Sequence, residues 1–216
     1  MRPRTTLFYD VDTQRDFMEP GGKLYVPGAE RIFPQLATLT QCARQHGIPI
    51  VGSVDRHRPT DPELLANGGE YPEHCMSDTP GQAKVAVTTP QHAVWIENRV
   101  YSESELLTVL RHPGELYIEK QRFDVFAGNQ NATRVFDVLL HGKEDVVVYG
   151  VVTEVCVDYA IAGLRDRPVR LHVVRDAIAA LSAERGQAAM AKWWQWGVHL
   201  VTVDEVVADL GLGKII

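Results

Sequence analysis

The sequence has little cysteine, no long apolar run and no excess of positive charge. Three cysteines at wide spacing do not make a disulfide framework, so we expect reduced thiols and a cytoplasmic location. No apolar stretch approaches the ~20 residues of a membrane span, and the N-terminus lacks the apolar region of a secretory signal. The net charge of −6 argues against nucleic acid. We therefore expect neither a membrane nor a nucleic acid as partner.

The chain has 216 residues, of which 45% are hydrophobic, and this suits one globular domain spanning 1–216. Apolar, β-branched runs alternate with segments of helical periodicity. The pattern predicts strands at 7–12, 48–54, 93–96, 115–119, 145–151, 169–174 and 199–203, and helices at 30–46, 102–111, 131–141, 154–166 and 183–196. Repeated β-α units of this kind predict an α/β fold, with a mostly parallel sheet covered by helices on both faces.

Ionisable residues collect where the predicted strands end. Asp12 ends the first strand, Asp55 and His57 end the second, and Lys120 and Cys156 follow two later ones. Ligands of parallel α/β sheets bind at the carboxyl ends of the strands. Polar residues also gather at strand ends merely because loops begin there, so the pattern suggests a site without defining its chemistry.

Cys156 is the most informative of these residues. It lies in the first turn of the predicted helix 154–166, directly after a buried strand. Free N–H groups and the positive dipole end of a helix favour a thiolate, so this position predicts a nucleophile with a depressed pKa. The alternative is a small buried hydrophobe, the usual fate of a free cysteine.

Three ordered motifs bear on that choice. The segment Asp12-Thr-Gln-Arg-Asp-Phe17 resembles the D-x-Q-x-D-F motif of isochorismatase-like cysteine hydrolases. Lys120 and the segment Gly150-Val-Val-Thr-Glu-Val-Cys156 match the other two signatures of that family, in the same order. The resemblance covers nearly the whole chain, and it implies a three-layer α/β/α sandwich around a parallel sheet of about six strands.

The resemblance also assigns roles to residues. It implies Asp12 as the base, Lys120 as an electrostatic partner and Cys156 as the nucleophile. It further implies a cis peptide bond between Val151 and Val152, and backbone N–H groups of Val152 and Cys156 as an oxyanion hole. Family members commonly form dimers or tetramers, so the resemblance implies a homo-oligomer.

A second set of residues suggests a metal site. Asp55 and His57, two residues apart on a strand, point to the same side and can reach one ion. His74 can close a three-ligand set, and Glu63 is a candidate fourth ligand in the long excursion 58–84. This arrangement resembles the nicotinamidase branch, which implies a divalent metal: zinc, with iron or manganese as alternatives. Without the resemblance, the Asp55–His57 pair alone would more often be a salt bridge.

Aromatic residues are candidates for the substrate pocket. Phe17 and Tyr71 match the positions where nicotinamidases stack aromatics on the substrate ring, and Phe123 and Phe126 are further candidates. Ordinary core packing is the alternative for each of them. The segment after Lys120 lacks the glycine that usual nicotinamidases carry there, so the wall facing the substrate is expected to differ.

The resemblance therefore implies an amidohydrolase that converts nicotinamide, or a similar small carboxamide, to the acid and ammonia through a thioester. A related cysteine hydrolase acting on another amide or ureido compound is the alternative. Isochorismatase proper has no use for the metal pair Asp55 and His57. A catalytically idle binding protein of the same fold is the remaining class.

Overall fold

The computed structural model describes residues 1–211, and the end of the predicted 1–216 domain, 212–216, lies outside the described residues. One parallel sheet runs through it, with its strands in the order β3-β4-β2-β1-β5-β6-β7. The strands are Thr6–Val11 (β1), Ile50–Asp55 (β2), Val94–Ile96 (β3), Leu116–Lys120 (β4), Asp145–Val151 (β5), Arg170–Ala179 (β6) and His199–Val201 (β7).

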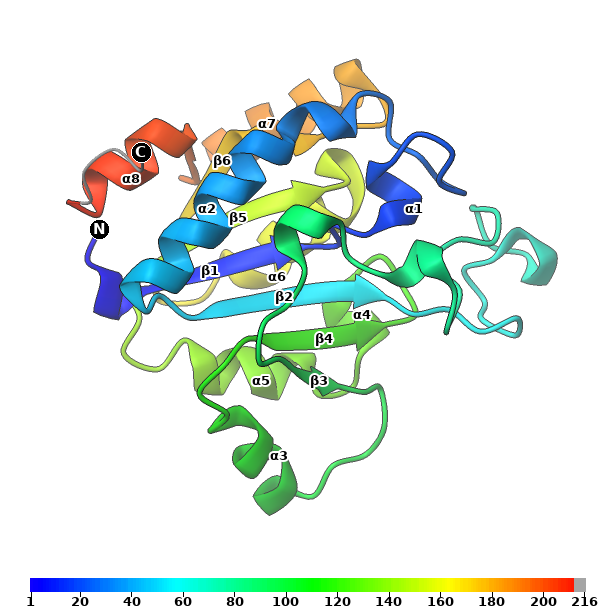
Figure 1. The fold of residues 1–216 in the computed structure, drawn as a ribbon, viewed down its shortest axis with the longest axis horizontal. Helices are drawn as coiled ribbons and strands as arrows, with labels where there is room; N and C mark the ends of the chain where they lie inside the picture. Colours follow the sequence, from blue (N-terminus) through cyan, green and yellow to red (C-terminus); the bar gives the residue numbers. More distant parts are fainter. Residues whose placement is uncertain (212–216) are drawn as a thin grey trace.

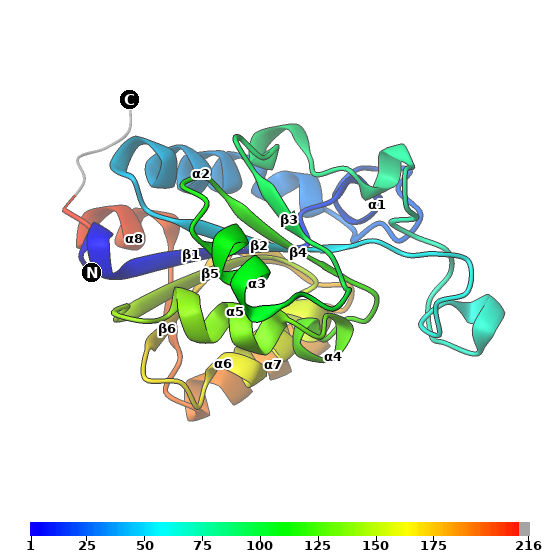
Figure 2. The same cartoon turned by 90° about the horizontal axis from the view of Figure 1, so that it is seen from below.

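Helices cover both faces of this sheet (Figures 1 and 2), which confirms the predicted α/β/α sandwich. One face packs against Arg15–Met18 (α1), Phe33–His46 (α2) and Val203–Asp209 (α8). The other packs against Glu103–Leu110 (α3), Val125–Gly128 (α4), Ala132–Leu139 (α5), Asp158–Leu164 (α6) and Ala183–Gln195 (α7). Within residues 1–211, no helix has both the length and the apolar character that a bilayer crossing requires.

The central strands are buried along their whole length, because helices cover both of their faces. Every residue of β1, β2 and β5 is buried. Such strands carry apolar runs rather than a strict alternation, and this is why the sequence pattern located them well.

The structure departs from the predictions at the edges of the sheet. The sheet has seven strands where the family resemblance implies about six; the short β3, which pairs with β4 at one edge, lies within the strand predicted at 93–96. Strand β6 continues to Ala179, beyond the predicted 169–174, past an irregular register with β5. Helix α8 was not predicted; Thr202 begins it with a reciprocal capping box to Glu205. The extension of β6 and the short helix α8 carry too weak a hydrophobic period to be recognised locally.

The strand order fixes where a site can form. The chain adds β2 and then β4 on one side of β1, and returns to place β5 on the other side. The carboxyl ends of β1 and β5 therefore border a topological switch point, where open α/β sheets bind ligands. Asp12 follows β1, and the turn that carries Cys156 follows β5.

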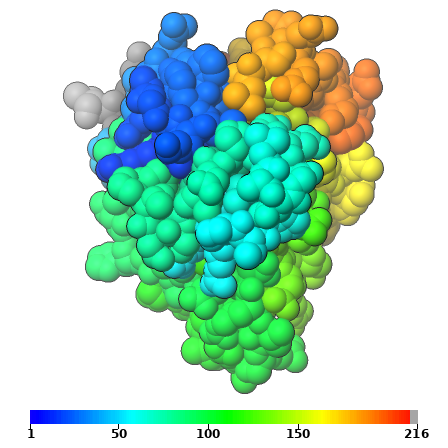
Figure 3. Space-filling view, turned by 90° about the vertical axis from the view of Figure 1, so that its right-hand side faces the viewer, coloured from blue at the N-terminus to red at the C-terminus, as the bar shows by residue number. Residues whose placement is uncertain are grey.

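The long connection from β2 to β3 lies over that end of the sheet. Part of it extends away from the body of the molecule in Figure 2 and holds the short turn Leu65–Asn67. In Figure 3, which faces the carboxyl ends of the central strands, the cyan to teal surface of this connection occupies the middle of the view. It returns to the body where Lys84 bridges to Gln14 in the loop after β1.

Gly150 is the tightest point between β1 and β5. It has φ +117, and a Cβ there would lie 2.0 Å from the carbonyl oxygen of Val11. We expect Gly150→Ala to lower the free energy of unfolding by about 3 kcal/mol or more. The new methyl group would overlap the Val11 carbonyl, and alanine would be strained at this positive φ. Gly142→Ala is the matched control. Gly142 has φ +73 but no atom within 4 Å of an added Cβ, so the substitution should lower the free energy of unfolding by only about 1 kcal/mol. Urea unfolding measures both, and equal losses would contradict the close approach.

Candidate active site

Three strand ends bring Asp12, Lys120 and Cys156 together in the buried interior. The ammonium Nζ of Lys120 lies 3.0 Å from Oδ2 of Asp12 and 3.7 Å from Sγ of Cys156. It also donates a short hydrogen bond to Asp55 at the end of β2. Asp12 and Lys120 have no exposed surface and Cys156 is 6% exposed. An acid, a cation and a thiol thus share one dry site, the combination that cysteine hydrolysis requires.

The backbone after β1 aims the Asp12 carboxylate. Asp12 has φ +48, a left-handed conformation uncommon for a residue with a side chain. Its N–H donates to the carbonyl of Ser53 at 3.1 Å, and the Ser53 hydroxyl donates to its Oδ1 at 2.7 Å. Strained backbone of this kind clusters at functional sites. Strand β2 therefore holds one carboxylate oxygen and leaves the other facing Lys120.

The pKa of Cys156 corrects the sequence prediction. Cys156 does lie in the first helical turn after β5, a π-helical turn Thr153–Val157 that leads into α6. Burial nevertheless raises the pKa of its thiol well above the ordinary value; Lys120 opposes the rise, and the charges of Asp12 and Asp55 add to it. The predicted depressed pKa is therefore wrong, because desolvation exceeds the effect of the helix start. The resting sulfur is a thiol that needs a base.

Asp12 has the properties of such a base. Burial raises its pKa, and the nearby charge of Asp55 raises it further, while Lys120 opposes both. Burial alone would lower the pKa of Lys120, but Asp12 and Asp55 hold it well above its ordinary value. Lys120 thus stays charged, while Asp12 can accept a proton more readily than an exposed carboxylate.

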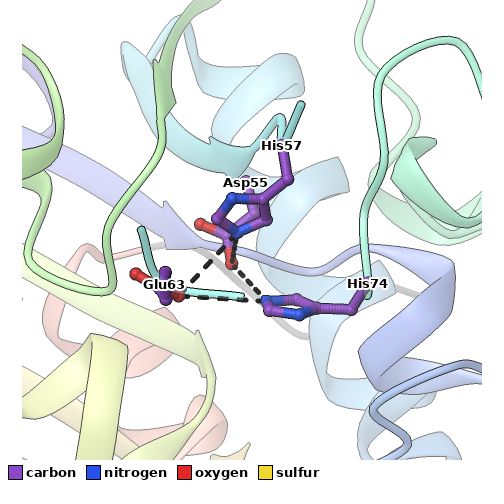
Figure 4. Close-up of side chains that lie close together, drawn as sticks. All are labelled: Asp55, His57, Glu63 and His74. Carbon is purple, nitrogen blue, oxygen red and sulfur yellow. Dashed lines mark ion pairs between the residues drawn. The ribbon is translucent and has the colours of Figure 1, made fainter. Parts of the chain in front are cut away.

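A second cluster adjoins the first through Asp55. Figure 4 shows the side chains of Asp55, His57, Glu63 and His74 pointing toward one another. The Nε2 atoms of the two histidines lie 3.9 and 3.6 Å from Asp55 Oδ2, and 3.8 and 3.9 Å from Glu63 Oε1. Two donors at ~2.1 Å from one ion lie no more than about 4.2 Å apart, and these four distances lie within that limit.

Hydrogen bonds behind the histidines fix which ring nitrogen faces the cluster. Nδ1 of His57 lies 3.2 Å from the Asp61 carboxylate, and Nδ1 of His74 lies 2.7 Å from the carbonyl of Pro72. Each ring therefore turns Nε2 inward, as metal-ligating histidines do. Nε2 of His57 is buried and has no hydrogen-bond partner within residues 1–211, which suits a ligand atom.

The side-chain types of this cluster suit a cation. Burial lowers the pKa of His57, so its ring is neutral. Burial raises the pKa of Glu63 to about 7, and the negative charge of Asp55 adds to that rise. For Asp55, burial favours the neutral acid, but Lys120 and His74 hold its pKa below the usual range. Two imidazoles and two carboxylates suit a divalent ion such as zinc, iron or manganese.

An apolar pocket opens onto Cys156. Its lining consists of Phe17, Leu24, Asp55, Glu63, Tyr71, His74, Phe123, Val152, Val155, Cys156 and Leu181. Three of the four predicted aromatic residues are therefore present. The ring centroids of Phe17 and Tyr71 lie 5.4 and 6.3 Å from that of His74. Phe126 is the exception: it packs against Phe136 and Gly163 in the core, because α4 turns it away from the pocket.

The pocket is narrow in this conformation. Its cavity of about 10 Å³ is close to the space that one water molecule needs. A carboxamide would have to displace part of a wall. The peptide bond between Val151 and Val152, beside this cavity, is cis as the resemblance implied.

Sequence reasoning missed several supporting residues. Gln14 clamps the end of β2, since its side-chain amide donates to the Asp55 carbonyl and accepts from the Asp55 N–H, both at 2.7 Å. Gln14 is part of the D-x-Q-x-D-F motif, so a signal was present. For Asp61, which lies four residues after His57, this spacing was the only feature of the sequence that could have indicated its contact with His57. No feature of the sequence indicated Ser53, because its contact with Asp12 depends on the pairing of β2 with β1.

Comparisons with known proteins identify the family and the fold of this chain. The isochorismatase domain model matches residues 7–205. An Arabidopsis thaliana protein described as a probable inactive nicotinamidase is 26% identical over 97% of this chain and 98% of its own. The crystal structure of Pyrococcus horikoshii pyrazinamidase in complex with zinc is 24% identical, with a TM-score of 0.74 over 92% of this chain and 99% of that one. N-carbamoylsarcosine amidase from Thermoplasma acidophilum is 22% identical, with a TM-score of 0.70 over 94% and 98%.

The contacts behind the four-residue cluster generate a binding prediction. We expect one Zn²⁺ per chain in equilibrium dialysis, and His74→Ala to abolish most of that binding. Asp61→Ala should weaken it about 10- to 100-fold, because His57 loses the partner that orients its ring. Glu73→Ala, which removes an exposed acid of the same loop, is the control and should leave affinity unchanged. Equal affinities for the Asp61 and Glu73 variants would contradict the proposed orientation of His57.

Proposed function

The chain belongs to the isochorismatase family, and on that premise we propose that it is a metal-assisted cysteine amidohydrolase. It would hydrolyse nicotinamide or a similar small carboxamide to the acid and ammonia. The observation that carries the proposal is the contact of Lys120 with Asp12, Asp55 and Cys156, which joins the thiol to the cluster of possible metal ligands.

The proposed reaction begins with proton transfer from Cys156 to the Asp12 carboxylate. The sulfur bonds to the carboxamide carbon, and the carbonyl electron pair moves to oxygen, which backbone N–H groups of Val152 and Cys156 would hold. The carbon–nitrogen bond then breaks, and the nitrogen takes the proton from Asp12 and leaves as ammonia. Lys120 keeps its positive charge throughout and stabilises whichever neighbour is negative.

Hydrolysis of the thioester repeats the same exchange. Asp12 takes a proton from water, the hydroxide bonds to the acyl carbon, and the carbon–sulfur bond breaks. The sulfur of Cys156 then recovers the proton from Asp12. The raised pKa of Asp12 supports this role, because the group must both accept and release a proton in each half-reaction.

Asp55, His57, Glu63 and His74 would hold the metal. A bound divalent ion would offer an open position to a ring nitrogen of the substrate and so fix the ring relative to Cys156. The buried Nε2 of His57, without a partner among residues 1–211, supports this assignment. The aromatic side chains of the pocket would lie against the substrate ring.

The character of the pocket favours a neutral carboxamide over an N-carbamoyl amino acid. The wall of the pocket away from the possible metal ligands is apolar, with Phe17, Leu24, Tyr71, Phe123 and Leu181. A substrate that carries its own carboxylate would lose hydration against this wall, at a cost in desolvation. This argument favours the nicotinamide-like reading over the ureido alternative.

The test is ammonia release from purified protein with nicotinamide and a panel of other amides. Cys156→Ala should lower turnover at least about 10³-fold, because the nucleophile is lost. Cys42→Ala is the matched control, since Cys42 is a buried cysteine of the core, and it should retain activity. Chelation should remove most nicotinamide turnover, and added zinc, iron or manganese should restore it.

Two outcomes would redirect the proposal. Turnover of a different amide that is insensitive to chelator would keep the cysteine chemistry and remove the nicotinamide assignment. If no amide reacts and the Cys156→Ala variant matches the parent, the idle binding protein becomes the better reading. The Arabidopsis relative, described as a probable inactive nicotinamidase, is the observation that keeps this second candidate in view.

A further inference from the structure

Glu154 is a buried acid beside the site to which the proposed chemistry gives no role. It lies two residues before Cys156 in the same π-helical turn, and its side chain is 5% exposed. Oε1 accepts a hydrogen bond of 2.7 Å from the backbone N–H of Ser182. Oε2 is buried without a partner among residues 1–211. A buried carboxylate with one unpartnered oxygen is costly and therefore needs an explanation.

The bonded N–H belongs to the loop between β6 and α7. Ser182 begins α7, because its hydroxyl accepts a hydrogen bond from the N–H of Arg185. Leu181, the residue before it, lines the pocket together with Cys156. The hydrogen bond of Glu154 therefore ties the turn that carries the nucleophile to the segment that carries an apolar wall.

We propose that Glu154 is a positioning residue that, through the N–H of Ser182, holds Leu181 against the substrate side of Cys156. The part of this inference that concerns substrate fit rests on the proposed function. Cys156 and Leu181 come from different connections of the sheet, β5 to α6 and β6 to α7. This hydrogen bond sets the distance between them and so sets the width of the pocket.

The hydrogen bond, rather than an ion pair, carries the effect. Arg185 lies 3.8 Å from Oε1, but its side chain is 63% exposed, and exposed pairs contribute little. An N–H bonded to a buried carboxylate is worth more. A glutamine at 154 keeps an acceptor oxygen of the same reach, so it should preserve the loop position, whereas an alanine cannot.

The kinetic experiment uses Glu154→Ala, Glu154→Gln, Leu181→Ala and the double variant of Glu154→Ala with Leu181→Ala. Glu154→Ala should raise KM for nicotinamide about tenfold while kcat changes less than about twofold, since substrate fit and not chemistry is altered. Glu154→Gln should stay within about threefold of the parent KM. The double variant should be no worse than Leu181→Ala, because both act on one wall. Glu184→Ala, an exposed acid in the first turn of α7, is the matched control and should match the parent.

A second measurement does not need turnover. The rate at which iodoacetamide alkylates Cys156, followed by mass spectrometry of its peptide, reports how open the wall is. It should rise several-fold in Glu154→Ala and in Leu181→Ala, and stay at the parent rate in Glu154→Gln and Glu184→Ala. If the parent hydrolyses no amide yet this pattern appears, the proposed function falls and the positioning role stands.

The proposal is overturned by any of three results. In the first, Glu154→Ala lowers kcat with KM unchanged. In the second, the effects of Glu154→Ala and Leu181→Ala on KM multiply in the double variant. In the third, Glu154→Ala and Glu154→Gln alkylate at the same rate. Urea unfolding of Glu154→Ala would reveal a general loss of folding. In that case the alkylation rates of Leu181→Ala and Glu154→Gln decide the proposal.

Discussion

Lys120 is a fully buried cation at the end of β4, and the site is built around it. Removing an ammonium from water costs several kcal/mol, and only nearby anions held in fixed positions offset that cost. Asp12 from the loop after β1 and Asp55 from the end of β2 supply them. The ends of the neighbouring strands β4, β2 and β1 therefore place charged side chains at one point. Cys156, which follows β5, lies beside them. The charge of Lys120 lowers the pKa of both carboxyl groups against the effect of burial.

Asp55 is the member that belongs to both clusters. One of its oxygens faces Lys120, and the other faces His57 and His74. A divalent ion held by His57, His74, Glu63 and Asp55 would therefore share the Asp55 carboxylate with Lys120. The charge of such an ion would lower the negative charge that Asp55 presents near the Cys156 thiol. In the proposed mechanism, Asp55 would thus connect substrate orientation with nucleophile chemistry. The raised pKa of Cys156 is consistent with the proposal that a neighbouring base activates the sulfur.

The walls of the pocket come from connections rather than from the sheet. Phe17 follows β1, Tyr71 belongs to the long connection after β2, Phe123 follows β4, and Leu181 follows β6. Such loops vary without disturbing the sheet, which explains how one fold carries several related hydrolytic activities. The cavity is narrow, so a carboxamide of the proposed kind would have to displace at least one of these walls.

The sequence by itself determined the central strands, the α/β/α class, and the residues placed at strand ends, among them Asp12, Asp55 and Cys156. These follow from local signals: buried parallel strands are continuous apolar runs, and strand ends mark where a site forms. Only the tertiary structure decided the extension of β6 to Ala179, the removal of Phe126 from the pocket, and the supporting contact of Asp12 with Ser53. It also reversed the predicted pKa shift of Cys156. Each of these depends on which groups distant in sequence come within a few ångströms, and on how completely water is excluded between them. Local periodicity carries no information on either quantity.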